Sequence, residues 1–332
     1  MALTLLSIPS LSLAQSIEPQ ADEAVGYWNA ALQTMGGKQF WTDVEHLDGW
    51  RVQEHASTGH FRLLDDKDIR RAWGNELHCR QTLATAKNER NLKTSRGTVV
   101  LTIHGLIRSR DSMESLAEYV QAHGDWEVIN LQYASTRNPI GEHAAALKKV
   151  IDRLGPEVTE IHIVAHSLGN LVVRHYLHDN TDSATGQQGD PRIKRMVMLG
   201  PPNQGSRLAR LLNSSMAFNT VCGPSGAQLS SGWKKLETNL ATPKFEFGII
   251  AGGDIDGSSY DNVLLSGMDD LTVSVAETQL PGASDTLIVP ALHGSLMRLE
   301  SVHAVTTCYL KNGYFQSETA RQAIPSSPEK QP

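Results

Sequence analysis

Short apolar stretches alternate with segments whose apolar residues recur every three to four positions between about residues 97 and 313. The short stretches are typical of buried strands, and the recurring pattern is typical of helices that cover a sheet. Strands are expected at 98–103, 126–131, 161–165, 193–199, 245–251 and 286–289, and helices at 112–122, 141–154, 168–179 and 300–310. This order predicts an α/β fold with a mostly parallel sheet and helices on both faces.

Residues 22–96 precede this alternation and show a different pattern. We expect a helical entry, a β-hairpin, a charged helix and a polar linker, at 22–48, 50–64, 65–83 and 86–96 in turn. The hairpin would add an antiparallel edge to the main sheet. Four tryptophans lie in this extension, and we expect them to pack over the sheet edge rather than to dock a partner: Trp28, Trp41, Trp50 and Trp73.

Two segments interrupt or follow the alternation. Residues 213–243 are rich in serine, glycine, asparagine and threonine, with large apolar side chains scattered among them. Such an insertion can be a small lid over a pocket or a plain surface excursion, and the pattern favours neither. Residues 314–332 form a tail after the main domain, which spans 97–313.

The composition is that of a globular protein. The chain has 332 residues, of which 40% are hydrophobic and 20% charged, and its net charge is -6. This mild negative charge without a basic cluster argues against nucleic acid or an acidic membrane as the main partner. Transient contact with a lipid surface remains compatible with it, and the sequence does not specify an oligomeric state.

The first residues predict export. Residues 1–14 are apolar and uncharged and end in Ser12-Leu13-Ala14, which resembles a secretory cleavage site, although no basic residue precedes the apolar run. We therefore expect the protein to be secreted or periplasmic. If the segment is not a signal peptide, a cytoplasmic location is the alternative. None of the three cysteines, Cys79, Cys222 and Cys308, lies in a CxxC pair, so no metal site is expected. In an exported protein two of them can form a disulfide.

The main candidate for chemistry is the stretch from Ile161 to Asn170, which contains Ala165-His166-Ser167-Leu168-Gly169. It predicts a strand, a sharp turn with serine at its apex, and a helix, which together form a nucleophile elbow. Small residues two positions either side of the serine leave room for this turn. The backbone N–H of Leu168 then points to where an oxyanion would form.

Two further segments complete the constellation. His104-Gly105-Leu106 ends the first buried strand, and the N–H of Leu106 is the candidate second oxyanion donor, while His104 is expected to support the loop. The base should follow the last strand, where His293 lies. His303 falls in the next helix and is the weaker candidate, and His175 and His178 lie on the elbow helix.

The acid should lie between the strand at 245–251 and the strand at 286–289. Position alone leaves several aspartates open, namely Asp254, Asp256, Asp261, Asp269 and Asp270. Asp254 and Asp256 directly follow a strand end but also fit turns. Asp270 precedes an apolar alternation that can fix its backbone.

These segments resemble those of lipase/esterase-type α/β-hydrolases, similar to bacterial triacylglycerol lipases and GPI inositol-deacylase-like hydrolases. The resemblance covers about Thr98 to Gly313 and also includes Pro201-Pro202-Asn203-Gln204-Gly205-Ser206, which it places at the pocket rim. It implies that Asp270 is the acid, with Asp269 as the alternative, although Leu271 stands where the family usually has glycine.

The resemblance implies a serine hydrolase that cleaves carboxylic esters through an acyl-enzyme, with lipid or acyl esters as the expected substrates. Ser167 would be the nucleophile, His293 the base and Asp270 the acid, with Leu106 and Leu168 forming the oxyanion hole. No metal or organic cofactor is required. The same residues would serve an acyltransferase, thioesterase or amidase, and a non-catalytic binding protein is the alternative of another class.

Overall fold

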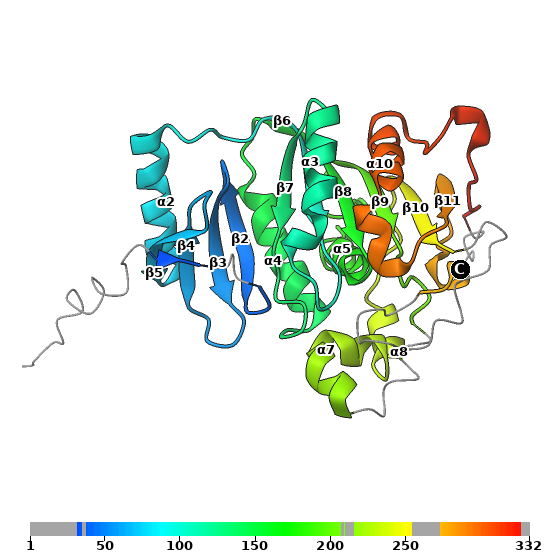
Figure 1. Cartoon of the computed structure of the whole chain (residues 1–332), viewed down its shortest axis with the longest axis horizontal. Helices are drawn as coiled ribbons and strands as arrows, with labels where there is room; N and C mark the ends of the chain where they lie inside the picture. Colours follow the sequence, from blue (N-terminus) through cyan, green and yellow to red (C-terminus); the bar gives the residue numbers. More distant parts are fainter. Residues whose placement is uncertain (1–31, 35–37, 207–208, 210–215, 254–272, 327–332) are drawn as a thin grey trace, which may run out of the picture.

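The computed structural model describes residues 32–34, 38–206, 209, 216–253 and 273–326. Within them the chain forms a six-stranded sheet and a five-stranded sheet that lie next to each other (Figure 1). The predicted signal segment, residues 1–14, lies outside the described residues, as do all five candidate aspartates.

The six-stranded sheet carries the predicted α/β alternation. Its strands run parallel in the order β11-β10-β9-β8-β6-β7. They are β6 (Gly97–Ile103), β7 (Glu127–Leu131), β8 (Val158–His166), β9 (Ile193–Leu199), β10 (Glu246–Gly252) and β11 (Asp285–Val289). Every strand expected from the apolar runs is present, with bounds that differ by at most a few residues.

Helices cover both faces of this sheet. One face carries α3 (Glu114–His123) and α10 (Glu300–Asn312), and the other carries α4 (Ile140–Arg153) and α5 (Leu168–Asp179). Successive residues of β6 point to opposite sides, since Val100 packs with the α3 and α10 side chains and Leu101 with those of α4 and α5. Burial on both faces explains why the strands read as continuous apolar runs.

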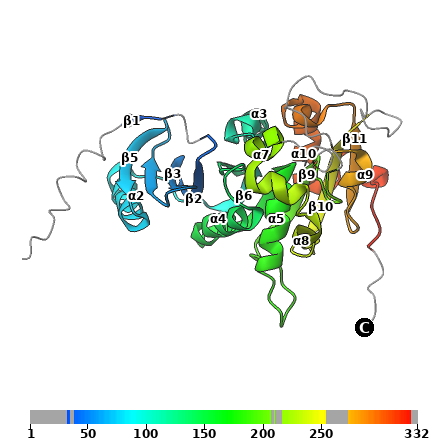
Figure 2. The same ribbon diagram turned by 90° about the horizontal axis from the view of Figure 1, so that it is seen from below.

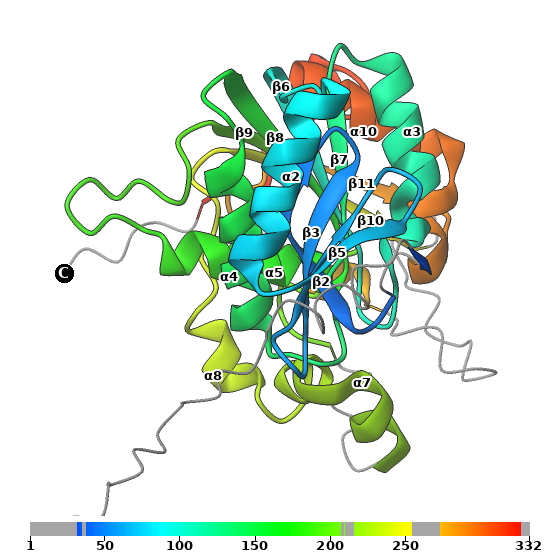
Figure 3. The same ribbon diagram turned by 90° about the vertical axis from the view of Figure 1, so that its left-hand side faces the viewer.

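The N-terminal extension forms a sheet of its own. Its strands are antiparallel in the order β1-β5-β4-β3-β2, and α2 packs on one face of them. They are β1 (Leu32–Gln33), β2 (Trp41–Leu47), β3 (Trp50–His55), β4 (Phe61–Leu64) and β5 (Ile69–Gly74), followed by α2 (Glu76–Arg90). Figures 1 and 3 show α2 on the side that faces away from the six-stranded sheet, and Figure 2 shows the two sheets from below.

Three expectations for the extension need correction. The hairpin is confirmed as β3 and β4, but it belongs to the separate sheet and adds no edge to the parallel one. The helical entry is wrong over 41–47, which is β2. The charged helix begins only at Glu76, because Asn75 caps it there and the preceding residues pair as β5 with β4. It then continues to Arg90, into the expected linker.

The tryptophans of this extension pack inside it. Trp41 and Trp50 are buried, Trp50 in the apolar core under α2, while Trp73 is half-buried against Trp41. The guanidinium of Arg62 lies over the ring of Trp41, 4.1 Å from its centroid. Packing therefore accounts for these three side chains, and Trp28 lies outside the described residues.

The described part of the insertion is helical. It contains α7 (Met216–Leu229) and α8 (Trp233–Glu237), and Leu229 and Trp233 join the main apolar core. The hydroxyl of Ser225 donates to the carbonyl of Asn138, 2.8 Å away, beside the start of α4. This region is thus docked on the domain rather than a plain excursion, and its action as a lid stays a prediction.

The C-terminal region and the cysteines complete the fold. Residues up to 326 pack against β11, where the buried carboxylate of Asp285 accepts hydrogen bonds from the N–H groups of Phe315 and Gln322. The three cysteines are free thiols, so the conditional disulfide is not formed. None of the helices among the described residues is long and apolar enough to cross a membrane.

Candidate active site

Ser167 lies at the turn between β8 and α5, as the elbow motif predicts. Its backbone has φ 51° and ψ -119°, a conformation that is strained for any residue with a side chain. Its N–H donates to the carbonyl of Leu199 over 2.8 Å, and its own carbonyl accepts from the side-chain amide of Asn170 over 3.0 Å. Neighbouring β9 and the first turn of α5 therefore hold the strained residue in place.

Two glycines, Gly169 in the elbow and Gly105 in the loop after β6, lie where a side chain would clash with neighbouring atoms. A Cβ atom on Gly169 would lie 2.8 Å from the carbonyl oxygens of both Ile103 and His104. A Cβ atom on Gly105 would lie 2.8 Å from Nδ1 of His166. These approaches are closer than carbon normally tolerates, so the loop after β6 and the elbow pack together only with glycine at both positions.

His293 contacts the serine directly. It lies just after β11, at the start of the 3₁₀ helix His293–Arg298, and its Nε2 is 2.9 Å from the Ser167 hydroxyl oxygen. At this distance the hydroxyl can donate to the imidazole. Both residues are buried, and Nε2 of His166 lies 3.1 Å from the backbone carbonyl of His293.

The surroundings favour a neutral imidazole. Burial removes water from the ring, and the positive charge of Arg108 adds to this effect, so the pKa of His293 is lowered to about 4. His293 is thus unprotonated at neutral pH and able to accept a proton, which is the state that a general base needs.

The two expected oxyanion donors lie on either side of the serine turn. Leu168 is the first residue of α5, and Leu106 follows Gly105 at the end of β6. Within the part of the chain that the structure describes, neither backbone N–H donates a hydrogen bond. The next residue, Ile107, has φ 60°, which is unusual for a β-branched residue, and its N–H donates to the Ser135 hydroxyl over 3.1 Å.

His104 supports this loop, as expected, and does not reach the serine. Its ring stacks on that of Tyr133 with centroids 4.2 Å apart, and its Nδ1 lies 2.8 Å from the carbonyl of Gly105. The Tyr133 N–H donates to Nε2, which leaves Nδ1 to donate. Burial lowers the pKa of His104 to about 4, so the ring is neutral.

The third member of the expected triad stays a prediction. Asp270, Asp269, Asp254, Asp256 and Asp261 all lie outside the described residues. Among the residues that are described, no carboxylate hydrogen-bonds to His293.

The remaining histidine candidates have other contacts. Nε2 of His303 lies 3.0 Å from the carbonyl of Met297, and Nδ1 of His175 lies 2.8 Å from Asp179. His178 is exposed at the end of α5. In the described parts of the chain, no group of three or more histidine, cysteine, aspartate or glutamate residues is arranged to hold a metal ion.

The segment 201–206 anchors the insertion at this end of the sheet. Arg174 of α5 donates to the side-chain oxygen of Asn203 before the insertion, over 3.0 Å, and to the carbonyls of Leu240 and Ala241 near its end. The side-chain amide of Asn203 donates to the carbonyl of Thr278 over 2.8 Å. Because burial lowers the pKa of Arg174 only to about 10, its guanidinium stays charged.

Sequence reasoning missed the supporting residues around this site. His166 contacts the loop of the base, and Ser135 holds the loop of one oxyanion donor. The place of His166 inside the elbow was a signal. Ser135 gave no signal in the sequence, because its contact with Ile107 depends on how the segment after β7 packs against the segment after β6.

Comparisons with known proteins give distant similarities. A family described as a domain of unknown function (DUF7379) matches residues 67–223. No curated protein matches the sequence. Among solved structures, the chain is similar to the mature lipase BlEst2 of Bacillus licheniformis, with 16% identity, coverage of 65% of this chain and 91% of that one, and a TM-score of 0.45.

Two further solved structures show a similar degree of likeness. Phospholipase PlaB of Legionella pneumophila, in complex with thio-NAD, is 16% identical, with coverage of 66% of this chain and 56% of that one and a TM-score of 0.47. The metagenomic carboxyl esterase MGS0156 is 18% identical, with coverage of 61% and 66% and a TM-score of 0.46. The strand order, the helical layers and the elbow of this chain are themselves those of an α/β-hydrolase fold, so the predicted fold class is confirmed.

Proposed function

We propose that this protein is a serine hydrolase that cleaves carboxylic esters through an acyl-enzyme. The observation that supports the proposal most strongly is the 2.9 Å contact between the Ser167 hydroxyl and Nε2 of His293 at a strained elbow. A nucleophile within hydrogen-bond distance of a neutral base is the arrangement that acyl transfer requires.

The proposed reaction uses residues of this chain alone. Ser167 attacks the ester carbonyl while Nε2 of His293 takes its proton, and the N–H groups of Leu106 and Leu168 stabilise the oxyanion. His293 then protonates the leaving alcohol, and water repeats the sequence on the acyl-enzyme. Asp270 is the proposed acid that orients the imidazole and stabilises its charged form.

The proposed substrates are lipid or other acyl esters. The insertion docked at the same end of the sheet as the elbow carries large apolar side chains, which supports an apolar acyl group. Export and transient contact with a lipid surface belong to the same proposal.

The test is hydrolysis of a chain-length series of p-nitrophenyl esters, combined with labelling by a fluorophosphonate probe. The wild type should hydrolyse at least one ester and take one label, and Ser167→Ala should lose both. Ser112→Ala is the matched control, because that hydroxyl only donates to the carbonyl of Ser109. Full ester hydrolysis by Ser167→Ala would refute the proposal, whereas labelling without ester turnover would point to a thioester, an amide or acyl transfer.

A further inference from the structure

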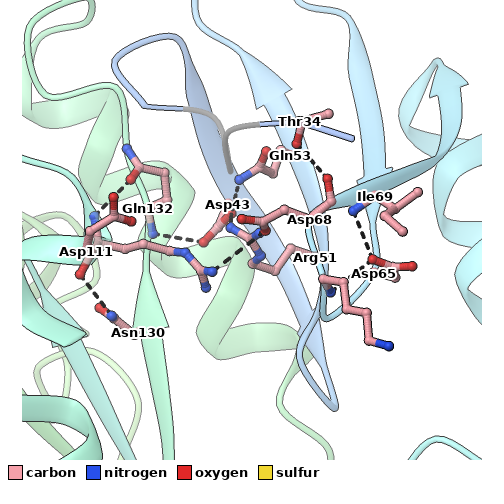
Figure 4. A network of polar contacts seen from close by, with 12 residues as sticks. Thr34, Asp43, Arg51, Gln53, Asp65, Asp68, Ile69, Asp111, Asn130 and Gln132 are labelled. Carbon is pink, nitrogen blue, oxygen red and sulfur yellow. Dashed lines mark hydrogen bonds and ion pairs between the residues drawn. The ribbon is translucent and has the colours of Figure 1, made fainter. Parts of the chain in front are cut away.

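The face of the five-stranded sheet that is turned toward the six-stranded sheet is polar and charged. Asp43, Arg51 and Gln53 lie on it and are at most 2% exposed. The side-chain amide of Gln53 donates to Asp43 over 2.7 Å, and Arg51 forms an ion pair with Asp68 (Figure 4). Apolar side chains would suffice to pack the two sheets together, so the buried polar and charged side chains of this face need a further explanation.

Contacts from this part of the chain reach the segment that directly follows the oxyanion loop. The side-chain amide of Gln39 donates to the backbone carbonyl of Arg108 over 3.1 Å. A carboxylate oxygen of Asp68 lies 3.7 Å from the guanidinium of Arg110. The ammonium of Lys38 pairs with Asp111. Leu106, the expected oxyanion donor, lies two residues before Arg108.

A second route to the same segment passes through Gln132, just after β7. Asp43 and Gln132 exchange two hydrogen bonds of 2.8 Å, because each backbone N–H donates to the other residue. The side-chain oxygen of Gln132 then accepts the backbone N–H of Arg110 over 2.9 Å. Burial alone would raise the pKa of Asp43, but the hydrogen bond and charge of His46 and the charge of Arg51 hold it well below its usual range.

The oxyanion loop needs such external support. Ile107 has a positive φ, and a strained residue keeps its conformation only where its surroundings over-determine it. Its N–H is held by Ser135, and the side-chain oxygen of Gln39 accepts the hydroxyl of the next residue, Thr136, over 3.2 Å. The amide of Gln39 therefore links the oxyanion loop, through Arg108, to the segment after β7 that holds Ile107.

We propose that the N-terminal sheet positions the oxyanion loop, with Gln39 and Asp43 as its positioning residues. Buried charge networks contribute little net stability but demand one geometry, which suits a sheet that sets the place of a backbone donor. This role rests on the proposed ester hydrolysis. Neither residue touches the reacting atoms: Gln39 acts through Arg108, and Asp43 acts through Gln132 and Arg110.

The central test is Gln39→Glu, which has the same shape and keeps the acceptor for Thr136 but loses the donor to the Arg108 carbonyl. We expect kcat on the best p-nitrophenyl ester to fall about tenfold, because a displaced oxyanion donor acts mainly in the transition state, while KM changes less than about twofold. Affinity for a boronic acid that forms a tetrahedral adduct with the serine should fall by a similar factor.

Asp65→Asn is the matched control. Asp65 is also a buried carboxylate of the five-stranded sheet, and its hydrogen bonds go to Lys67, Ile69 and Arg71 within that sheet. This variant should lose stability and keep the kcat of its folded fraction. Hydrogen exchange of the peptide 104–110 should be faster in Gln39→Glu and Asp43→Asn than in the wild type and Asp65→Asn.

The outcomes separate the two proposals. An active wild type whose Gln39→Glu variant keeps its kcat and its exchange rate overturns the positioning role alone, as does an equal loss of kcat in Asp65→Asn. A wild type with neither ester turnover nor fluorophosphonate labelling overturns the proposed function, and the role of the sheet in it.

Discussion

Replacing Ser167 by glycine should give a more stable protein than replacing it by alanine. Both variants lose the hydroxyl and its contact with His293, so the difference between them isolates the backbone. Ser167 has φ 51° and ψ -119°, where a Cβ atom clashes with the main chain and glycine does not.

The size of the difference follows from two opposing effects. Residues held in sparsely populated backbone regions cost about 1–3 kcal/mol each, and glycine removes this strain. Glycine also makes the unfolded chain more flexible, which costs about 0.4–1 kcal/mol. We therefore expect the free energy of unfolding of Ser167→Gly to exceed that of Ser167→Ala by about 1 kcal/mol, since the strain relief is the larger effect.

Urea unfolding of the two variants, followed by fluorescence, measures this difference. The matched control is Ala145→Gly, at an exposed position in the middle of α4, where glycine should lower the free energy of unfolding by about 1 kcal/mol relative to alanine. If the backbone at Ser167 is strained, glycine should give the more stable protein at position 167 and alanine the more stable protein at position 145. If Ser167→Ala is as stable as Ser167→Gly or more so, the elbow stores no backbone strain.

The site supports four more predictions. Gly169→Ala should destabilise the protein by about 1–3 kcal/mol and lower ester turnover, because its Cβ would press on two backbone oxygens; thermal unfolding and kinetics check this. Burial and Arg108 lower the pKa of His293 to about 4, and the proposed carboxylate of Asp270 would raise it, so kcat/KM of the wild type should fall to half at a higher pH than that of Asp270→Asn; an equal or lower pH would argue against the proposed contact. In Asp270→Asn the unfolded state binds this proton below pH 6.5 and the folded state does not, so the free energy of unfolding of this variant should fall as the pH falls from 6.5 toward 4, measurable by urea titrations across this range. Asp270→Asn should lower kcat by about 10⁴, whereas Asp269→Asn should leave most of it, and a reversed order would assign the acid to Asp269.

The sequence predicted the parallel sheet and the elbow because both depend on local patterns. A continuous apolar run such as β8 marks a strand buried on both faces, and a serine between Ala165 and Gly169 marks a turn with no room for side chains. The contact of His293 with Ser167 followed from a rule about where parallel strands end.

The N-terminal sheet could not be predicted in the same way. Its strand β2 has Asp43 and Glu45 among apolar residues, so its sequence does not alternate simply, and besides pairing with β3 it hydrogen-bonds to Gln132 far along the chain. The face that carries Arg51 and Gln53 reads as solvent-exposed in the sequence and is buried in the structure. This burial arises from the packing of the five-stranded sheet against the six-stranded one, which the sequence does not show.

One guanidinium, that of Arg174, binds the chain both before the insertion and near its end. The start and the end of this segment are therefore bound to the same residue of α5, independent of the residues between them. Closing a longer loop costs only about 0.6 kcal/mol for each doubling of its length. The stability of the protein with a different insertion would therefore depend mainly on how well that insertion packs, and little on its length. A different segment can therefore replace this one while the parallel sheet and the elbow stay unchanged.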